Sequence, residues 1–303
     1  MIRRVITDTP RVTAHGGERP GSAAQAILDK AGHENFPVAS RFLPKRHRAH
    51  LMAVYGFARL VDDIGDEAPP DERLPLLDAV AADVDRLYAG DTPRLPVVAA
   101  LAGTVRATNV PKEPLHDLIA ANRQDQIVSR YATYDDLLGY CKLSANPVGL
   151  IVLHLFGYAT PHRITLSDRV CTALQLAEHW QDVAEDLGNG RVYLPQEDLE
   201  AYGCTEDDLA APHANERVRA LMTFQTDRAA RLLDLGAPIV GTLRGFARVA
   251  VAGYVAGGRA ALAAIRGADH DVLSGTPRPR AARLIPELAR ALATTPVSTG
   301  ERP

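Results

Sequence analysis

The chain has 303 residues, of which 46% are apolar and 23% charged, and this composition is typical of a globular protein with a sizeable core. The formal net charge is -3 and the basic residues are mostly Arg, with Lys only at 30, 45, 112 and 142, so nucleic-acid binding is not expected. Cys141, Cys171 and Cys204 lie far apart without a Cys-x-x-Cys pair, which argues against a disulfide framework or a zinc site and fits a reducing cytoplasm.

Neither end of the sequence has the pattern of a folded segment. Residues 1–20 and 293–303 are polar and rich in Pro, Gly and Thr, and we expect flexible tails there. No apolar core of signal-peptide length follows the first arginines, and the apolar runs at 148–158 and 246–256 are shorter than the roughly 20 residues of a membrane span. The sequence predicts a cytoplasmic protein and leaves open a peripheral association with the inner face of the membrane.

Helical periodicity runs through most of the chain. Ala- and Leu-rich windows recur at helical spacing and alternating β-branched segments are almost absent, so we expect an all-α fold. The breaks carry Gly, Pro or Asn and none is long enough for an interdomain linker, which predicts a single domain over 21–292. The expected helices are 22–31, 45–65, 71–88, 94–108, 113–128, 134–157, 162–187, 206–235 and 238–266.

The first chemically informative segment is "YGFARLVDDIGDE" at 55–67. Asp62 and Asp66 are four residues apart and project from one face of the expected helix, where two like charges repel. Tyr55 and Arg59 fall on the same stripe. The helix is otherwise apolar nearly all round, which implies burial and raises the cost of the two charges. We therefore expect a cation to neutralise the pair.

A second segment, "QLAEHWQDVAEDLGNGRVYLP", starts at Gln175 and repeats this spacing. Asp182 and Asp186 are again four residues apart, and either Glu178 or His179 lies on the same face. In a chain with many aspartates the spacing alone proves little, because solvated acidic faces also explain it. The apolar surroundings of both pairs favour the functional interpretation.

Carboxylate pairs on buried helices suit a hard divalent cation. Mg²⁺ takes one or two carboxylates together with waters and the oxygens of a substrate phosphate, so the two segments predict a diphosphate substrate. Arg59 and Arg191 would add bidentate contacts to the diphosphate, although each also has a plain explanation as a surface arginine.

Four segments follow one another along the chain, namely "HENFPVASRFLP" (33–44), "AVYGFARLVDDIGDE" (53–67), "YCKLSANPVG" (140–149) and "QLAEHWQDVAEDLGNGRVYLP" (175–195). In this order they resemble the signature segments of the squalene/phytoene synthase family, and the resemblance covers most of residues 22–266. Within the family, "ENFPVAS" and "LSANPVG" are most similar to the bacterial hydroxysqualene synthases of hopanoid pathways. Sister enzymes usually carry a Ser-rich first segment and an A-G-x-V-G third segment.

The resemblance implies an all-α isoprenoid-synthase fold with a central prenyl-diphosphate cavity, the two aspartate pairs facing each other across its mouth. Asp62, Asp66, Asp182 and Asp186 would hold Mg²⁺ and, with Tyr55, form the catalytic set. The residues implied near the diphosphate are Asn35, Arg59, Gln175, Arg191 and Tyr193, and those implied along the prenyl channel are Phe36, Tyr140, Val148 and Tyr254. The Phe-Pro stretch would cap the cavity, although Phe36 also has a plain explanation as a staple onto the next helix.

One departure from the family pattern concerns the second aspartate segment. The family usually has Asn where this chain has Glu178, and often an aromatic residue where it has His179. Glu178 would then be an additional metal ligand or turn away from the site. We interpret His179 as a helix-face histidine with satisfied hydrogen bonds, in preference to a proton-transfer group.

The implied reaction is the Mg²⁺-dependent conversion of presqualene diphosphate to hydroxysqualene with release of diphosphate. The carbocation that remains needs an apolar, aromatic-lined pocket and one water to quench it. Pro147 should kink the helix expected at 134–157, and the freed backbone groups with the Asn146 amide would hold that water, unless the kink serves packing alone.

Two alternatives stay open. The first is a sister activity, the head-to-head condensation of two farnesyl or geranylgeranyl diphosphates, as in presqualene diphosphate, squalene or phytoene synthases. The second is a non-catalytic helical partner of such an enzyme, against which the complete set of four aspartates argues. Other enzymes of the pathway are implied as partners.

Overall fold

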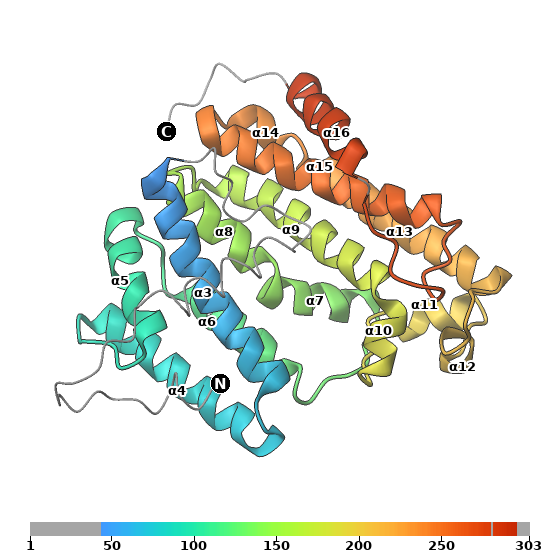
Figure 1. Cartoon of the computed structure of the whole chain (residues 1–303), viewed down its shortest axis with the longest axis horizontal. Coiled ribbons are helices and arrows are strands. Elements are labelled where there is room, and N and C mark those ends of the chain that lie inside the picture. The colour runs from blue at the N-terminus through green and yellow to red at the C-terminus, as the bar shows by residue number, and fades with distance from the viewer. Residues whose placement is uncertain (1–43, 280, 296–303) are drawn as a thin grey trace, which may run out of the picture. The chain divides into compact units, whose positions relative to one another are not determined.

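The computed structural model describes residues 44–279 and 281–295 (Figure 1). Over these residues the chain is helical, with one isolated β-bridge between Arg130 and Val192 and no strand, which confirms the all-α prediction. The chain divides into two compact units, residues 1–123 and 124–303. One domain over 21–292 between two flexible tails stays a prediction.

The described part of the first unit is built from helices α3 (Lys45–Glu67), α4 (Pro70–Ala89), α5 (Pro96–Thr108) and α6 (Glu113–Gln124). Helices α3, α4 and α5 pack against one another, in the blue to teal part of Figure 1. Their fully buried side chains include Phe57, Val61, Ile64, Leu77 and Val98. Because α3 buries its apolar residues in this way, its acidic stripe is held in a fixed orientation.

A buried aspartate fixes the connection between α4 and α5. Gly90 caps the C-terminus of α4, and its φ of 87° lies in the left-handed region that glycine adopts without strain. The Asp83 carboxylate accepts hydrogen bonds from the N–H of Arg94 at 2.8 and 2.9 Å and from the N–H of Leu95 at 2.8 Å. The buried charge is therefore satisfied by the backbone of the turn.

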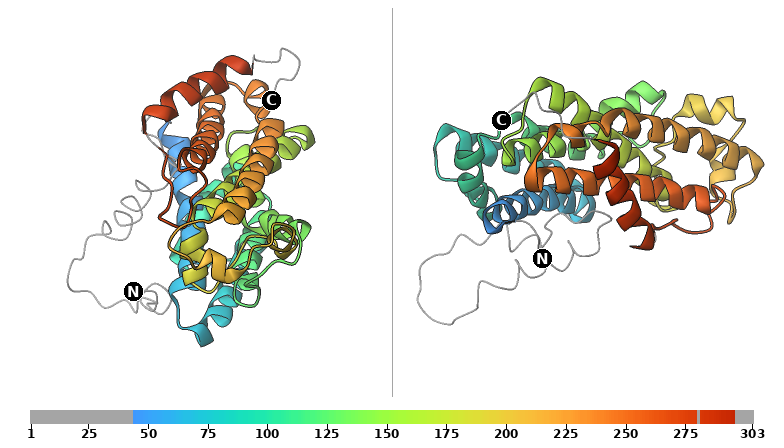
Figure 2. Two further views of the ribbon diagram at one scale, coloured as in Figure 1. Left: turned by 90° about the vertical axis from the view of Figure 1, so that its right-hand side faces the viewer. Right: turned by 90° about the horizontal axis from the view of Figure 1, so that it is seen from above.

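Helix α9 (Pro161–Gln181) is the central helix of the second unit. Its Ala173, Leu176 and Trp180 are fully buried, and α7, α8, α13, α14 and α15 pack against it (Figures 1 and 2). The other helices of this unit are α7 (Tyr134–Ser144), α8 (Asn146–Leu155), α10 (Val183–Gly188), α11 (Gln196–Ala201), α12 (Glu206–Leu209), α13 (Glu216–Gly236), α14 (Ile239–Thr242), α15 (Gly245–Gly267) and α16 (Ala281–Thr294).

Two glycines allow neighbouring helices to approach α9 closely. A Cβ atom at Gly149 of α8 would overlap Ser167 Oγ and Cys171 Sγ, and one at Gly236 of α13 would lie 2.8 Å from the Leu166 carbonyl oxygen. Both crossings therefore require glycine. The "LSANPVG" segment thus serves, in part, to pack α8 on α9.

Helix α15 is the one helix of the described residues that is long and apolar enough to cross a membrane, judged by length and composition alone. Of its most apolar window, 56% is buried inside the protein, and α9, α13, α14 and α16 pack around it. These are the surroundings of a core helix.

Several expected helices have different bounds. The helix expected at 22–31 lies outside the described residues. The helix expected at 113–128 ends at Gln124. Four further expected helices are each divided in two: 134–157 at Ala145, 162–187 at Asp182, 206–235 over 210–215 and 238–266 at 243–244. A side-chain cap explains the third interruption, because Asn215 Oδ1 accepts a hydrogen bond from the Val218 N–H at 3.0 Å and so starts α13 anew.

Helices α11 and α16 are not predicted from the sequence. Pro286 interrupts the pattern of α16, although Leu284, Leu288 and Leu292 recur every four residues. Helix α16 packs along α15, and Arg248 Nη2 of α15 donates to the carbonyl oxygens of Leu292 at 2.8 Å and Thr295 at 2.9 Å. Tertiary packing and capping of the last carbonyl groups therefore stabilise α16 where local propensity does not.

Candidate active site

Asp62 and Asp66 project from the same face of α3, one turn apart. Both keep access to solvent, whereas Val61 and Ile64 on the same helix are fully buried. The pKa of Asp62 is raised to about 6, chiefly by desolvation and further by the charges of Asp66 and Asp63. This repulsion is what a bound cation would relieve.

Arg59 lies beside the aspartate pair of α3. Its Nη2 is 2.7 Å from Asp63 Oδ1 and 3.6 Å from Glu67 Oε1, in ion pairs that are partly exposed. Tyr55, one turn earlier, is buried. Partly exposed ion pairs contribute little and exchange readily, so these contacts leave the guanidinium able to turn to an anionic ligand. Its contact with a diphosphate stays a prediction.

Asn122 of α6 is a site residue that the sequence does not reveal. Its Nδ2 donates to Asp62 Oδ1 at 3.1 Å and to the Leu118 carbonyl oxygen at 3.3 Å. This hydrogen bond favours the ionised carboxylate and acts against the desolvation that raises the pKa of Asp62. The sequence signal is weak, because a polar residue after "LIAA" could equally face solvent.

The second aspartate pair lies where α9 gives way to α10. Asp182 occupies the break with φ -107° and ψ 18°, and the Asp186 N–H donates to its carbonyl oxygen at 2.8 Å. The pKa of Asp186 is raised to about 7, chiefly by burial and next by the charge of Asp182. Glu185 and Asp125 raise it further, whereas Arg191 lowers it. Burial also raises the pKa of Asp182.

Glu178 stands one turn before Asp182. The Asp182 N–H donates to the Glu178 carbonyl oxygen at 3.0 Å, so the backbone keeps helical spacing up to the break. The Glu178 side chain is half-buried. Its role as an additional metal ligand stays a prediction.

A short turn brings Arg191 and Tyr193 back to the second aspartate pair. Gly190 has a φ of 79°, and the Arg191 N–H donates to the Asp186 carbonyl oxygen at 2.8 Å. The next N–H along the chain donates to the Ser129 carbonyl oxygen at 2.9 Å and forms the isolated β-bridge. The turn therefore fixes the arginine charge close enough to Asp186 to lower the pKa of that carboxyl.

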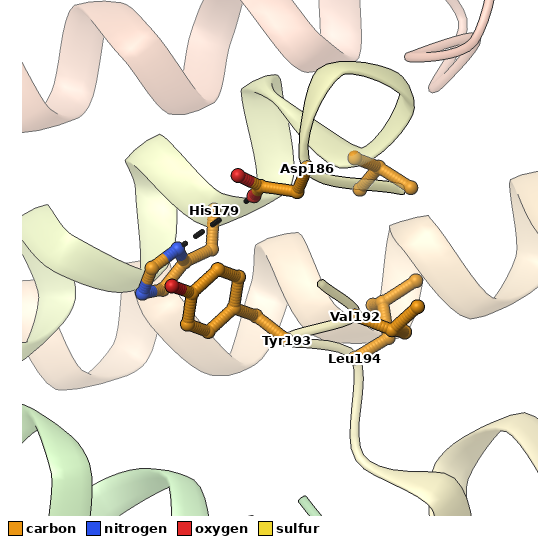
Figure 3. A pocket seen from close by; sticks show the side chains of 6 residues that line it. His179, Asp186, Val192, Tyr193 and Leu194 are labelled. Atoms are coloured by element: carbon orange, nitrogen blue, oxygen red, sulfur yellow. Dashed lines mark ion pairs between the residues drawn. The ribbon is translucent and has the colours of Figure 1, made fainter. Parts of the chain in front are cut away.

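His179 lies between Gln175 and Tyr193. Gln175 Nε2 is 3.1 Å from His179 Nε2, and because an amide nitrogen can only donate, the ring proton is on Nδ1. His179 Nδ1 lies 3.9 Å from Asp186 Oδ2, as the dashed line in Figure 3 marks. Burial, and next the Arg191 charge, lower the pKa of His179 to about 3. The imidazole is therefore neutral at physiological pH and shares a hydrogen bond with Gln175, which supports its interpretation as a helix-face histidine in preference to a proton-transfer group.

A small pocket lies between the second aspartate pair and the returning loop. Figure 3 shows the Tyr193 ring lying against the His179 ring with Asp186 above them. The lining residues are His179, Val183, Asp186, Val192, Tyr193 and Leu194. The pocket is thus lined by one acidic side chain and by aromatic and aliphatic side chains. Such a lining suits a ligand that has an ionic group next to an apolar chain.

A tyrosine cluster continues this aromatic wall. The Tyr140 ring lies 5.6 Å from Tyr131 and 5.7 Å from Tyr193, and Tyr140 Oη donates to Asp125 Oδ2 at 2.9 Å. Burial raises the pKa of all three phenols, so they are neutral. The structure brings the predicted residues Tyr140 and Tyr193 together. Asp125 and Tyr131 are missed from the sequence. They belong to the connection between α6 and α7, and their partners Tyr140 and Tyr193 follow later in the chain, so no local pattern indicates a site.

Asn146 and Val148 lie on the first turn of α8. The predicted interruption of the helix is confirmed, but it falls at Ala145, with Pro147 in the first turn of the new helix, where proline is well tolerated. Asn146 Oδ1 accepts a hydrogen bond from Thr172 Oγ1 of α9 at 2.9 Å. Val148 is exposed and Tyr254 of α15 half-buried. The role of these three side chains along a prenyl channel stays a prediction.

The predicted site residues therefore fall into two groups. Tyr55, Arg59, Asp62 and Asp66 lie in the first unit and the others described lie in the second, and the expected facing of the two aspartate pairs stays a prediction. Asn35 and Phe36 lie outside the described residues. Gathered around one pocket and its aromatic wall in the second unit are Gln175, His179, Asp186, Arg191, Tyr193 and Tyr140.

The two aspartate pairs are the donors that the chain provides for Mg²⁺. No group of three or more His, Cys, Asp and Glu side chains among the described residues is arranged to hold a metal ion. Mg²⁺ does not need such a cage, because one or two carboxylates with waters and substrate phosphate oxygens suffice. Both aspartate pairs provide hard oxygen donors. Burial, and next the charge of the neighbouring aspartate, raises the pKa of Asp62 and of Asp186, so a cation would relieve the cost of ionising them and the donor set fits.

Comparison with known proteins identifies the family of this chain. Residues 30–284 match the family model for squalene/phytoene synthase. The hydroxysqualene synthase of Sinorhizobium fredii is 36% identical over 70% of this chain and 72% of its own length, and the phytoene synthase of Mycobacterium bovis is 32% identical over 70% and 71%. The crystal structure of the squalene synthase HpnC from Alicyclobacillus acidocaldarius has a TM-score of 0.76 and 40% identity, and the match covers 82% of this chain and 93% of that one. As its four segments indicate, the chain belongs to the squalene/phytoene synthase family.

Proposed function

We propose that this protein converts presqualene diphosphate to hydroxysqualene, with release of diphosphate, in an Mg²⁺-dependent reaction. The observation that carries the proposal is the pair of acidic sites, each with an aspartate pKa raised to about 6 or 7, in a member of a family of synthases. Relatives named hydroxysqualene synthase at 36% identity, and the "ENFPVAS" and "LSANPVG" segments, support this reaction among the family's activities.

Asp62 and Asp66 in the first unit, and Asp182 and Asp186 in the second, would hold the metal. Bound there, Mg²⁺ would supply Lewis-acid stabilisation of the departing diphosphate. Arg191, whose charge acts on Asp186, would add a fixed positive charge next to the same leaving group. Glu178 would adjust the negative charge of the second site.

The aromatic wall would protect the carbocation that remains. Tyr131, Tyr140 and Tyr193 are buried neutral phenols, and their ring faces stabilise a cation without offering a basic group that would remove a proton. Neutral His179 extends this wall. The water that quenches the cation would bind at the α7–α8 interruption. There the Thr172 hydroxyl donates to Asn146 Oδ1 of the side chain and so orients the side-chain amide nitrogen of Asn146.

The second candidate function is head-to-head condensation of two prenyl diphosphates. Relatives named phytoene synthase, at 32% identity over a similar share of the chain, favour it. Product analysis with farnesyl diphosphate and presqualene diphosphate supplied separately distinguishes the two functions. Hydroxysqualene formed rapidly from presqualene diphosphate supports the proposal, whereas turnover of prenyl diphosphates to condensed products alone replaces it with the second candidate.

We also propose that the protein works in the cytoplasm at the surface of the inner membrane, with other enzymes of the same pathway, because both prenyl substrate and alcohol product are lipids. Phe246 and Val249 of α15, one turn apart, are 50% and 49% exposed and would supply apolar contacts. Co-sedimentation with anionic vesicles tests this. If Phe246→Ser/Val249→Ser binds vesicles as wild type does, these residues are not the contact.

A further inference from the structure

We propose that Asn122 is a positioning residue that holds the Asp62 carboxylate in a single orientation for the divalent cation, and that Gly65 is required because it leaves room for the Asn122 side chain. This inference rests on the proposed function, in which Asp62 is a metal ligand. It assigns the role to two residues outside the four-aspartate pattern.

The Asn122 amide is fixed at both hydrogens. Its Nδ2 donates to Asp62 Oδ1 at 3.1 Å and to the Leu118 carbonyl oxygen at 3.3 Å, and the side chain is 9% exposed. The second bond ties the amide to its own helix, so the first bond is delivered from a rigid element. This donor engages one lone pair of Asp62 Oδ1 and fixes the plane of the carboxylate, so we expect Oδ2 to be the oxygen presented to a cation.

Gly65 forms the other side of this arrangement. A Cβ atom placed there would overlap Asn122 Oδ1 and lie 3.2 Å from Asn122 Cγ. Glycine inside a helix is less favourable than alanine, so its presence between Ile64 and Asp66 needs a reason. The close approach of the Asn122 amide to α3 supplies that reason without any role for backbone flexibility.

The test measures metal binding directly. Wild type and variants are titrated with Mn²⁺ in the presence of inorganic diphosphate, and free Mn²⁺ is followed by electron paramagnetic resonance. Asn122→Leu keeps the size of the side chain and removes the donor, and we expect it to weaken Mn²⁺ binding about 10- to 100-fold, as loss of a partner of a metal ligand typically does. Gly65→Ala should weaken binding to a similar extent by displacing the amide.

A matched control and a double variant distinguish a positioning role of Asn122 from a general effect on folding. Gly103→Ala lies on α5 of the same unit, where an added Cβ meets nothing within 4 Å, and it should leave Mn²⁺ binding unchanged. Gly65→Ala/Asn122→Ala removes the overlap, so its melting temperature should recover relative to Gly65→Ala while its Mn²⁺ binding stays weak. Recovery of both properties would show that Asn122 serves packing only and would overturn the inference.

Two further variants distinguish failure of this inference from failure of the proposed function. Asp62→Ala should weaken Mn²⁺ binding. Adding Asn122→Leu to it should cause no further loss, because Asn122 acts on the metal only through the Asp62 carboxylate, which is then already absent. If Asp62→Ala weakens binding but Asn122→Leu alone does not, the positioning role is wrong and the metal site stands. If Asp62→Ala binds Mn²⁺ as wild type does, the metal role of Asp62 is wrong and the inference falls with it.

Discussion

The His179 imidazole is stacked on the Tyr193 phenol ring, with ring centroids 3.7 Å apart and an interplanar angle of 15°. Two elements distant in sequence, the last turn of α9 and the loop after α10, are thereby joined beside Asp186. The contact explains how a histidine occupies a position where an aromatic residue is common in the family, because a neutral imidazole is itself a flat aromatic ring.

We therefore expect His179→Phe to keep the fold and to retain turnover within about 10-fold of wild type, since phenylalanine preserves the stacked ring. The pH–rate profile should keep its limb near pH 7, which we assign to Asp186, because His179 with a pKa of about 3 does not titrate there. Loss of that limb in the variant, with Asp186 intact, would assign the titration to His179 instead.

Asp62→Asn and Asp182→Asn should each remove most Mg²⁺-dependent turnover and leave the helical circular dichroism spectrum intact. Each change removes a negative ligand that acts mainly on the departing diphosphate, so we expect the rate to fall by roughly 100-fold or more. Asp234→Asn is the control, because the Asp234 side chain is 66% exposed and forms an ion pair with Arg259 at 2.8 Å. Near-normal rates in both site variants would contradict the metal assignment.

The metal-free protein should lose stability as the pH rises toward 7. The pKa of Asp186 is about 7 in the folded state against 3.8 for the free group, so between these values the folded state holds a proton that the unfolded state has released. Stability is then highest below pH 4 for this group and falls until the pH passes 7. Asp186→Asn should raise the free energy of unfolding at pH 8 by about 1–3 kcal/mol and have little effect at pH 4.

Urea unfolding of wild type and Asp186→Asn at pH 4 and 8, without divalent cations, measures this difference. Mg²⁺ with diphosphate should stabilise wild type at pH 8 and should bind more tightly as the pH rises through 7, because the ligand must be deprotonated. An Asp186→Asn protein that is less stable than wild type at pH 8 would mean that the carboxylate is satisfied in the folded state.

The helices and the two aspartate pairs can be predicted from the sequence because each depends on a local period. Asp62 and Asp66 share a face whatever surrounds α3. By contrast, Asn122 and Asp125 act through partners that are distant in sequence, and nothing local distinguishes them from solvated polar residues. The existence of α16 is likewise set by tertiary packing on α15, which here overrides a weak helix propensity.

We expect that no nicotinamide cofactor is needed and that the oxygen of the product comes from solvent. The expectation rests on the segments that resemble hydroxysqualene synthases and on the relatives of that name. Turnover of presqualene diphosphate in ¹⁸O-labelled water should place the label in the alcohol. An unlabelled hydrocarbon that forms only when reduced nicotinamide is added would show a reductive sister activity.

The final prediction concerns the water at the α7–α8 interruption. Helix α7 ends at Ser144 and α8 begins at Asn146, so carbonyl groups of the last turn of α7 lack a helical continuation there. Asn146→Ala/Pro147→Thr removes the amide and restores a backbone donor, and should divert product from hydroxysqualene to rearranged hydrocarbons or other alcohols.

Thr172→Val, which removes the donor to Asn146 Oδ1, should cause part of the same change. Thr165→Val is the matched control, because its hydroxyl donates within α9 to the Pro161 carbonyl oxygen at 3.1 Å. If the double variant gives the wild-type products at the wild-type rate, the interruption serves the packing of α8 on α9 at Gly149, and the water is held elsewhere.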